Sequence, residues 1–131
     1  MINVVIATHD CLAEKLLSAA ERIAGKQDNV YAIQMSLGES LSQMQEKLEI
    51  FIKGINDGKG VLILVDMVGG TPCNASVPLC RIFNTEVVTG VNLPMVLSAM
   101  FSSKIMENAK ELADKVYKDG QRSIVNIKRL F

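Results

Sequence analysis

Short runs rich in Val and Ile alternate with segments of helical periodicity along almost the whole chain, and this alternation constrains the fold most. It predicts strands at residues 2–7, 30–35, 61–65 and 86–91. It predicts helices at residues 12–24, 41–55, 71–83 and 94–119, the last with a break near Ser102. The run at 61–65 is apolar throughout, which is typical of a strand buried on both faces. Strands that alternate with helices form a parallel sheet covered on each side, so the sequence predicts an α/β fold.

The expected topology is a three-layer open sheet of flavodoxin-like order, in which the first and third strands are neighbours. Crossovers between parallel strands are right-handed, and this leaves few other arrangements for a short chain. Residues 123–127 follow Gly120 and alternate weakly in polarity, so they predict a fifth strand at the sheet edge. This strand either folds back onto its own sheet or reaches a second copy of the chain, and the pattern alone leaves both open.

Length and composition exclude several classes of protein. A chain of 131 residues predicts a single domain, residues 1–131. The 14 basic and 14 acidic residues balance, which argues against nucleic acid or an anionic membrane as the main partner. No targeting signal is recognisable and no apolar run approaches the ~20 residues of a membrane span, so we expect a cytoplasmic protein. The three cysteines lack metal-ligand spacing, and we interpret them as reduced, buried packing residues.

A histidine and an aspartate follow the two strands that are predicted to be neighbours. His9, the only histidine, comes after the first strand, and Asp66 comes after the third. Ligands of open parallel sheets bind beyond the carboxyl ends of the strands, and neighbouring strands lie only ~4.8 Å apart. A carboxylate that accepts one ring N–H leaves the other ring nitrogen free as a nucleophile. His9 and Asp66 are therefore the predicted catalytic residues, although a histidine at a strand end is more often a surface or capping residue.

A glycine-rich turn follows Asp66 and begins the third predicted helix. Thr71 is its expected N-cap, with Pro72 at the first helical position. Glycines let the backbone approach a ligand, and a helix N-terminus offers unpaired N–H groups and a positive dipole that suit phosphate. By itself such a turn would be an ordinary capped turn. In this context we predict four phosphate-binding residues, which are Thr8, Gly69, Gly70 and Thr71.

The segments around this turn contain no cationic side chain. No Lys or Arg occurs in residues 1–14 or in residues 61–80, and the lysine-containing P-loop motif of nucleotide-binding proteins is absent. Strong cationic contacts would hold a phosphate tightly and slow its onward transfer. The pattern therefore favours a site that holds a phosphoryl group briefly, and we expect no metal and no cofactor.

Three segments combine into a more specific pattern. They are Ala7-Thr8-His9, residues 60–66 followed by Gly69-Gly70-Thr71-Pro72 and Asn74, and residues 90–95 with the sequence GVNLPM. In this order and spacing, and over the whole length of the chain, they resemble the mannose-family enzyme IIA of the bacterial phosphoenolpyruvate-dependent sugar phosphotransferase system.

The resemblance implies a phosphotransferase with a phosphohistidine intermediate. His9 would be phosphorylated at Nε2, and Asp66 would orient its ring. The implied donor is the histidine-containing phosphocarrier protein, and the implied acceptor is a histidine of enzyme IIB, which serves sugar uptake by the membrane permease components. The resemblance also implies a homodimer in which the last strand of each subunit, antiparallel at the edge, joins the sheet of the other. Because the chain ends at Phe131, we expect enzyme IIB as a separate chain or as a part removed from this one.

Three residues depart from the usual pattern of that family. Val68 and Cys73 stand where aromatic residues are common, and these positions bear on the docking of partners. Asp10 stands where glycine is frequent, and we interpret it as a cap of the first helix.

Other functions are consistent with parts of the pattern. The same carrier chemistry serving dihydroxyacetone kinase or a regulatory partner remains an alternative. A response-regulator receiver would be phosphorylated on Asp66, but it needs a pair of acids after the first strand and a lysine late in the sheet. A flavodoxin-like cofactor binder needs a Ser/Thr-rich phosphate loop and stacking aromatic side chains, and this chain has no Trp. The sequence therefore favours a phosphocarrier.

Overall fold

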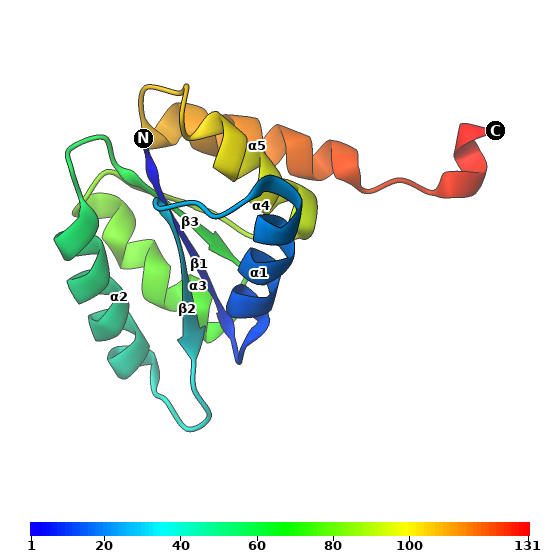
Figure 1. Cartoon of the computed structure of the whole chain (residues 1–131). Helices are drawn as coiled ribbons and strands as arrows, with labels where there is room; N and C mark the ends of the chain where they lie inside the picture. Colours follow the sequence, from blue (N-terminus) through cyan, green and yellow to red (C-terminus); the bar gives the residue numbers. More distant parts are fainter.

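A parallel sheet of four strands forms the centre of the computed structural model, which describes residues 1–131 (Figure 1). The order of the strands in space is β2-β1-β3-β4, and all three pairings are parallel. The strands are β1 (Asn3–His9), β2 (Val30–Met35), β3 (Val61–Val65) and β4 (Thr85–Val88). The predicted α/β class, the parallel sheet and the adjacency of the first and third strands are confirmed.

Helices cover both faces of the sheet, which gives the fold three layers (Figure 1). Helices α1, α4 and α5 pack on one face, and α2 and α3 pack on the other. Their bounds are α1 (Leu12–Ala24), α2 (Leu41–Ile55), α3 (Thr71–Ser76), α4 (Leu93–Ser102) and α5 (Ala109–Ser123), with 3₁₀ helices η1 (Val77–Arg81) and η2 (Ile127–Leu130). None of these helices has the length and apolar composition that crossing a lipid bilayer requires.

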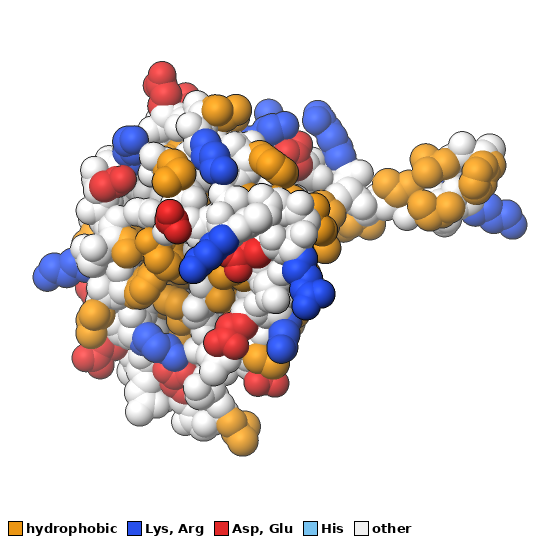
Figure 2. Space-filling view, viewed as in Figure 1, with side chains coloured by type: hydrophobic (Ala, Val, Ile, Leu, Met, Phe, Trp, Pro, Cys, Tyr) orange, Lys and Arg blue, Asp and Glu red, His pale blue; other side chains and the backbone are white.

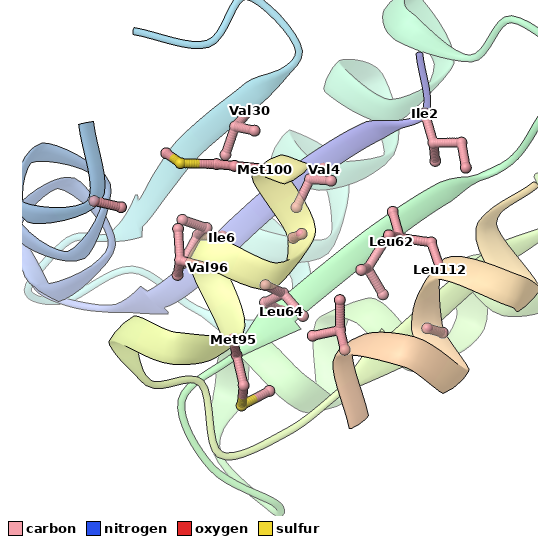
Figure 3. Close-up of a cluster of buried hydrophobic side chains, with 14 of the residues drawn as sticks. Ile2, Val4, Ile6, Val30, Leu62, Leu64, Met95, Val96, Met100 and Leu112 are labelled. Carbon is pink, nitrogen blue, oxygen red and sulfur yellow. The ribbon is translucent and has the colours of Figure 1, made fainter. Parts of the chain in front are cut away.

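The side chains of the central strands alternate between two apolar cores. In β1, Val4 and Ile6 belong to the core beneath α1, α4 and α5 (Figure 3). Val5 and Ala7 belong to the core beneath α2 and α3. Every residue of β3 is fully buried, as we predicted for residues 61–65. Because the two middle strands are enclosed on both faces, the residues at their carboxyl ends are held in fixed positions at one edge of the sheet.

Helix boundaries differ from the prediction where local packing decides them. The segment at 94–119 forms two helices, α4 and α5, and α5 continues past Gly120 to Ser123. A β-carbon on Gly120 would lie 2.7 Å from Cγ of Met95. This glycine therefore permits the close approach of α4 and α5 and does not end the helix. In the predicted helix at 71–83, α3 ends at Ser76 and η1 follows, since Pro78 lacks the N–H that would continue the helical hydrogen bonds.

The strand predicted at residues 123–127 is wrong for this chain. Ser123 ends α5, and Ile127–Leu130 forms η2. The tail leaves the body of the molecule, so that no strand lies beside it to pair with (Figure 1). Its apolar side chains are exposed, namely Ile124, Val125, Ile127, Leu130 and Phe131 (Figure 2).

The cysteines do not share one environment. Cys73 is buried within the smaller core, which confirms the packing interpretation for this residue. Cys11 and Cys80 are exposed, so that interpretation is wrong for both. All three are free thiols.

Candidate functional site

The predicted proximity of His9 and Asp66 is confirmed. Strand β1 pairs with β3 through Ala7 and Val65, so the residues that follow this pair emerge side by side. Nδ1 of His9 lies 2.7 Å from Oδ2 of Asp66, and the backbone N–H of His9 donates to the same oxygen at 2.9 Å. The other carboxylate oxygen accepts the N–H of Met67 at 3.0 Å. The aspartate is thus fixed by the backbone at the edge of the sheet, and it fixes the imidazole in turn.

Charge and exposure differ between the two partners. The Asp66 side chain is 13% exposed, whereas the His9 side chain is 46% exposed. Partial burial raises the pKa of the Asp66 carboxyl, but the hydrogen bonds from the His9 backbone and ring and the charge of the ring together outweigh it, so the pKa lies below its ordinary value. Asp66 is therefore ionised at neutral pH. An ionised carboxylate places the ring proton on Nδ1 and leaves the lone pair on Nε2.

The glycine-rich turn lies directly beside the imidazole ring. A β-carbon on Gly70 would lie 2.8 Å from Cε1 and 3.6 Å from Nε2 of His9. Thr71 is the first residue of α3, and its backbone N–H has no hydrogen-bond partner within the chain. Gly69 has a φ of 80°, in the left-handed region that favours glycine. The turn therefore places the N-terminal end of α3 beside the imidazole ring.

The end of this turn differs from the prediction. The N-cap of α3 is Gly70 instead of Thr71, and no side chain caps the helix. Asn74 fastens the turn instead, because its backbone N–H donates to the carbonyl of Gly70 at 2.9 Å and its side-chain amide donates to the carbonyl of Gly69 at 3.3 Å. The sequence motif includes Asn74, but its pattern gives no sign of this role.

Thr8 lies close to the site but faces the interior. Its side chain is fully buried, and its hydroxyl accepts the N–H of Ala13 at 2.8 Å and donates to the carbonyl of His9 at 3.1 Å. The hydroxyl thus donates one hydrogen bond and accepts one within the chain. Thr8 joins the end of β1 to the first turn of α1, directly behind His9.

Asp10 does not cap the first helix, so that interpretation is wrong. The N-cap of α1 is Cys11, no side chain caps this end in the usual way, and Thr8 binds the N–H of Ala13 instead. Asp10 has a φ of 51°, and its N–H donates to the carbonyl of Met35. A left-handed residue makes the sharp exit from β1, and its carboxylate stays exposed beside His9.

A hollow of about 430 Å³ opens beside the ring. Its lining includes His9, Asp10 and the loop after β2, at Met35, Ser36, Leu37 and Gly38. Exposed apolar side chains surround the same edge of the sheet, including Leu37, Met67 and Val68. The imidazole is thus reachable from solvent, within a surface where apolar side chains are unusually exposed. The structure brings no three His, Cys, Asp or Glu side chains together as a metal-binding group.

Comparisons with known protein sequences give a consistent result. Residues 3–117 match the family model EIIA-man, described as "PTS system fructose IIA component". The chain is 34% identical over 131 residues to the mannose-specific EIIAB component of Escherichia coli K12, a match that covers 97% of this chain and 40% of that protein. The chain therefore spans less than half of this relative. It is also 34% identical to the fructose-specific EIIA component of Bacillus subtilis, with 76% of this chain and 69% of that protein covered.

Solved structures show the same relationship. The EIIA component from Streptococcus agalactiae superposes with a TM-score of 0.89 and 32% identity, over 98% of this chain and 99% of that one. The mannose/sorbose-specific IIA subunit from Enterococcus faecalis superposes with a TM-score of 0.86 and 30% identity, over 95% and 93%. With the sheet order and the matched sequence family, these likenesses show that the chain belongs to the mannose family of EIIA components of the phosphotransferase system.

Proposed function

We propose that this protein is a phosphocarrier that accepts a phosphoryl group on Nε2 of His9 and passes it to a second protein. One observation carries the proposal. Nδ1 of His9 is held 2.7 Å from the ionised Asp66 carboxylate, while Nε2 of the half-exposed ring has no partner in the chain. This arrangement gives a nucleophilic nitrogen with a defined tautomer at an accessible surface.

The transfer step follows from this geometry. The lone pair of Nε2 attacks the phosphorus of a phosphohistidine on the donor protein, and the donor's N–P bond breaks with its electron pair returning to the donor's imidazole. The proton on Nδ1 stays against Asp66, whose negative charge stabilises the positive charge that develops on the His9 ring. Onward transfer reverses the roles, with the phosphorylated His9 as donor.

The turn beside the ring supplies donors for the phosphoryl oxygens. We assign phosphate binding to the backbone N–H groups of Gly70 and Thr71 and to the Thr71 hydroxyl, with the left-handed Gly69 allowing the turn. We assign Thr8 to positioning, because both capacities of its hydroxyl are used behind His9. With no Lys or Arg in residues 61–80, the phosphoryl group is held by neutral donors, which keeps onward transfer easy.

The relatives suggest the partners. They are described as mannose-, fructose- and sorbose-specific components of the phosphotransferase system. We propose that the donor is the histidine-containing phosphocarrier protein, that the acceptor is a histidine of enzyme IIB, and that the reaction serves sugar uptake from the cytoplasmic side. The apolar side chains around His9, such as Leu37 and Val68, would contact both partners in turn.

The tail supports a homodimer as part of this proposal. Strand β4 is an edge strand that pairs only with β3. The tail after α5 carries five exposed apolar side chains away from its own body (Figure 2). An unpaired sheet edge and an apolar segment without cover are both features that association removes. We propose that each tail packs along the β4 edge of a second copy.

Phosphorylation with purified components tests the function. The wild-type protein, mixed with labelled phosphoenolpyruvate, enzyme I and the histidine-containing phosphocarrier protein, should become labelled with a bond that is acid-labile and alkali-stable. The His9→Ala variant should stay unlabelled, with wild-type circular dichroism as the control for folding. Adding enzyme IIB should then remove the label from the wild-type protein.

Two outcomes would contradict the assignment. Label on the His9→Ala variant would place the phosphoryl group elsewhere. A label with the stability of an acyl phosphate would indicate Asp66, as in a response-regulator receiver.

A further inference from the structure

We infer that Gly70 is a positioning residue for His9, because the absence of a side chain at this place keeps the imidazole ring on Asp66. The inference rests on the proposed function only in taking His9 as the phosphoryl acceptor. Gly70 makes no polar contact with the ring in the structure. Its effect comes from the space that it leaves.

The backbone of Gly70 does not itself require glycine. Its φ of −76° and ψ of 161° are ordinary extended values that any L-residue adopts. The space around it does require glycine, since a β-carbon would lie 2.8 Å from Cε1 of His9 and 3.2 Å from Cγ of Met67. A separation of 2.8 Å between two carbon atoms is well inside their optimal contact distance of about 3.5–4.0 Å. A side chain at this position must therefore displace the ring, Met67 or the turn.

Of these three groups, the His9 ring is the one whose displacement would impair function. Met67 is 56% exposed and flexible, so its side chain can move into solvent. The turn is held by two hydrogen bonds from Asn74 and enters the helix through the buried Pro72, so it is less free to retreat. The imidazole is 46% exposed and is held on its other side by the 2.7 Å contact of Nδ1 with Asp66. Moving Cε1 away from residue 70 therefore strains or breaks that contact.

The two adjacent glycines are thus present for different reasons. Gly69 needs its left-handed backbone, and a β-carbon there would meet nothing within 4 Å. Gly70 has an ordinary backbone, and a β-carbon there meets the catalytic ring. A substitution at Gly70 should disturb chemistry more than folding, because a half-exposed ring can leave its place without opening the core.

The test compares Gly70→Ala with the wild-type protein and with a matched control, Gly54→Ala. Gly54 lies in α2, and a β-carbon there would meet nothing within 4 Å. Because His9 is the only histidine, its two ring nitrogens give the only imidazole signals in a ¹⁵N NMR spectrum.

In Gly70→Ala we expect these signals to lose the pattern of a ring with its proton fixed on Nδ1. We expect transfer from the phosphocarrier protein to fall about 10²-fold, the order of loss for a displaced reacting group. The midpoint of urea unfolding should stay near the wild-type value, and Gly54→Ala should match the wild type in ring signals and transfer.

A double variant separates the ring from its neighbour. Met67→Ala in the Gly70→Ala background removes the other side chain that residue 70 would touch, and we expect the altered ring signals to persist. Unchanged ring signals in Gly70→Ala would overturn the inference, and so would their recovery on adding Met67→Ala. The ring signals are recorded without any phosphoryl donor. If the wild-type protein itself accepts no phosphoryl group, the proposed function fails while the test of ring position still stands.

Discussion

At the level of single residues, one carboxylate oxygen organises the candidate site. Oδ2 of Asp66 accepts both the backbone N–H and the ring nitrogen of His9, so the same atom places the end of β1 and orients the imidazole. The lowered pKa of Asp66 keeps this acceptor charged at neutral pH. Asp10 adds an exposed carboxylate beside the ring, in a backbone conformation that glycine adopts more readily. The local charge is therefore negative before any phosphoryl group arrives.

Replacing Asp66 with Asn should slow transfer to His9 without unfolding the protein. The amide retains an oxygen for one hydrogen bond, but it loses the charge that holds the proton on Nδ1. Orienting and acid–base groups contribute about 10²–10⁴-fold to rates, and we expect a loss in that range. Rapid-quench measurement of labelled phosphoryl transfer gives the rate. Asp28→Asn, the same change at an exposed residue away from the site, serves as the control. A wild-type rate in Asp66→Asn would mean that the pairing has no role in transfer.

At the level of elements, the parallel pairing of β1 with β3 brings the site residues together. On one face of the sheet, a polar contact also joins helices α4 and α5. Asp119 of α5 accepts a hydrogen bond from Ser98 of α4 at 2.7 Å and pairs with Lys115 one helical turn earlier. The hydrogen bond from Ser98 is the main cause that lowers the pKa of Asp119, and Lys115 lowers it further. The ionised carboxylate is therefore favoured by folding.

The contribution of Asp119 to stability should depend on pH in one direction. Because its pKa is lower in the folded state than its ordinary value of 3.8, the contribution is fully present above that value and is lost as pH falls through the folded-state pKa. Asp119→Asn should thus reduce the free energy of unfolding at neutral pH, and the difference from wild type should shrink in acid. Urea unfolding of both proteins across this range measures it. A difference that is the same at every pH would show that the charge of Asp119 contributes nothing.

At the level of the whole molecule, the body and the tail differ in the burial of their apolar side chains. The body packs most of its strand side chains and one face of each long helix into two cores, one on each face of the sheet. The tail exposes its apolar side chains, with Phe131 at 98% and Ile124 at 80%. Contiguous exposed apolar surface of this kind marks a site of association. The sheet has two unpaired edges, β2 and β4, and we propose that the tail covers the β4 edge of a second copy.

Light scattering should therefore give a mass near twice the 14.3 kDa of one chain. Deleting residues 124–131 should give a monomer, because the deletion removes the tail and leaves α5 complete. That monomer should be less soluble, since both copies lose the cover of the β4 edge. His9 phosphorylation should persist in it, as the ring, Asp66 and the turn all come from one chain. A monomeric full-length protein at micromolar concentration would contradict the dimer and leave the carrier function unaffected.

The sequence by itself determined the four strands of the sheet, the approximate positions of the helices and the proximity of His9 and Asp66. Strand and helix patterns are local, and right-handed crossovers leave few topologies for a short chain. The flavodoxin-like order among them makes the first and third strands neighbours, so the residues that follow these strands lie together. Family likeness then indicated which ring nitrogen would react. None of these inferences required the position of any side chain.

Only the tertiary structure decided what the glycines, the threonine and the tail do. Gly70 leaves space for the ring of His9, and Gly120 leaves space for Met95. In the sequence, neither can be distinguished from a glycine that ends a helix. The Thr8 hydroxyl accepts the backbone N–H of Ala13, and this hydrogen bond depends on the angle between β1 and α1. The tail forms a strand only if another strand lies beside it, and in the single chain none does. In each case the outcome depends on contact between groups brought together by folding, and local sequence periodicity carries no record of such contacts.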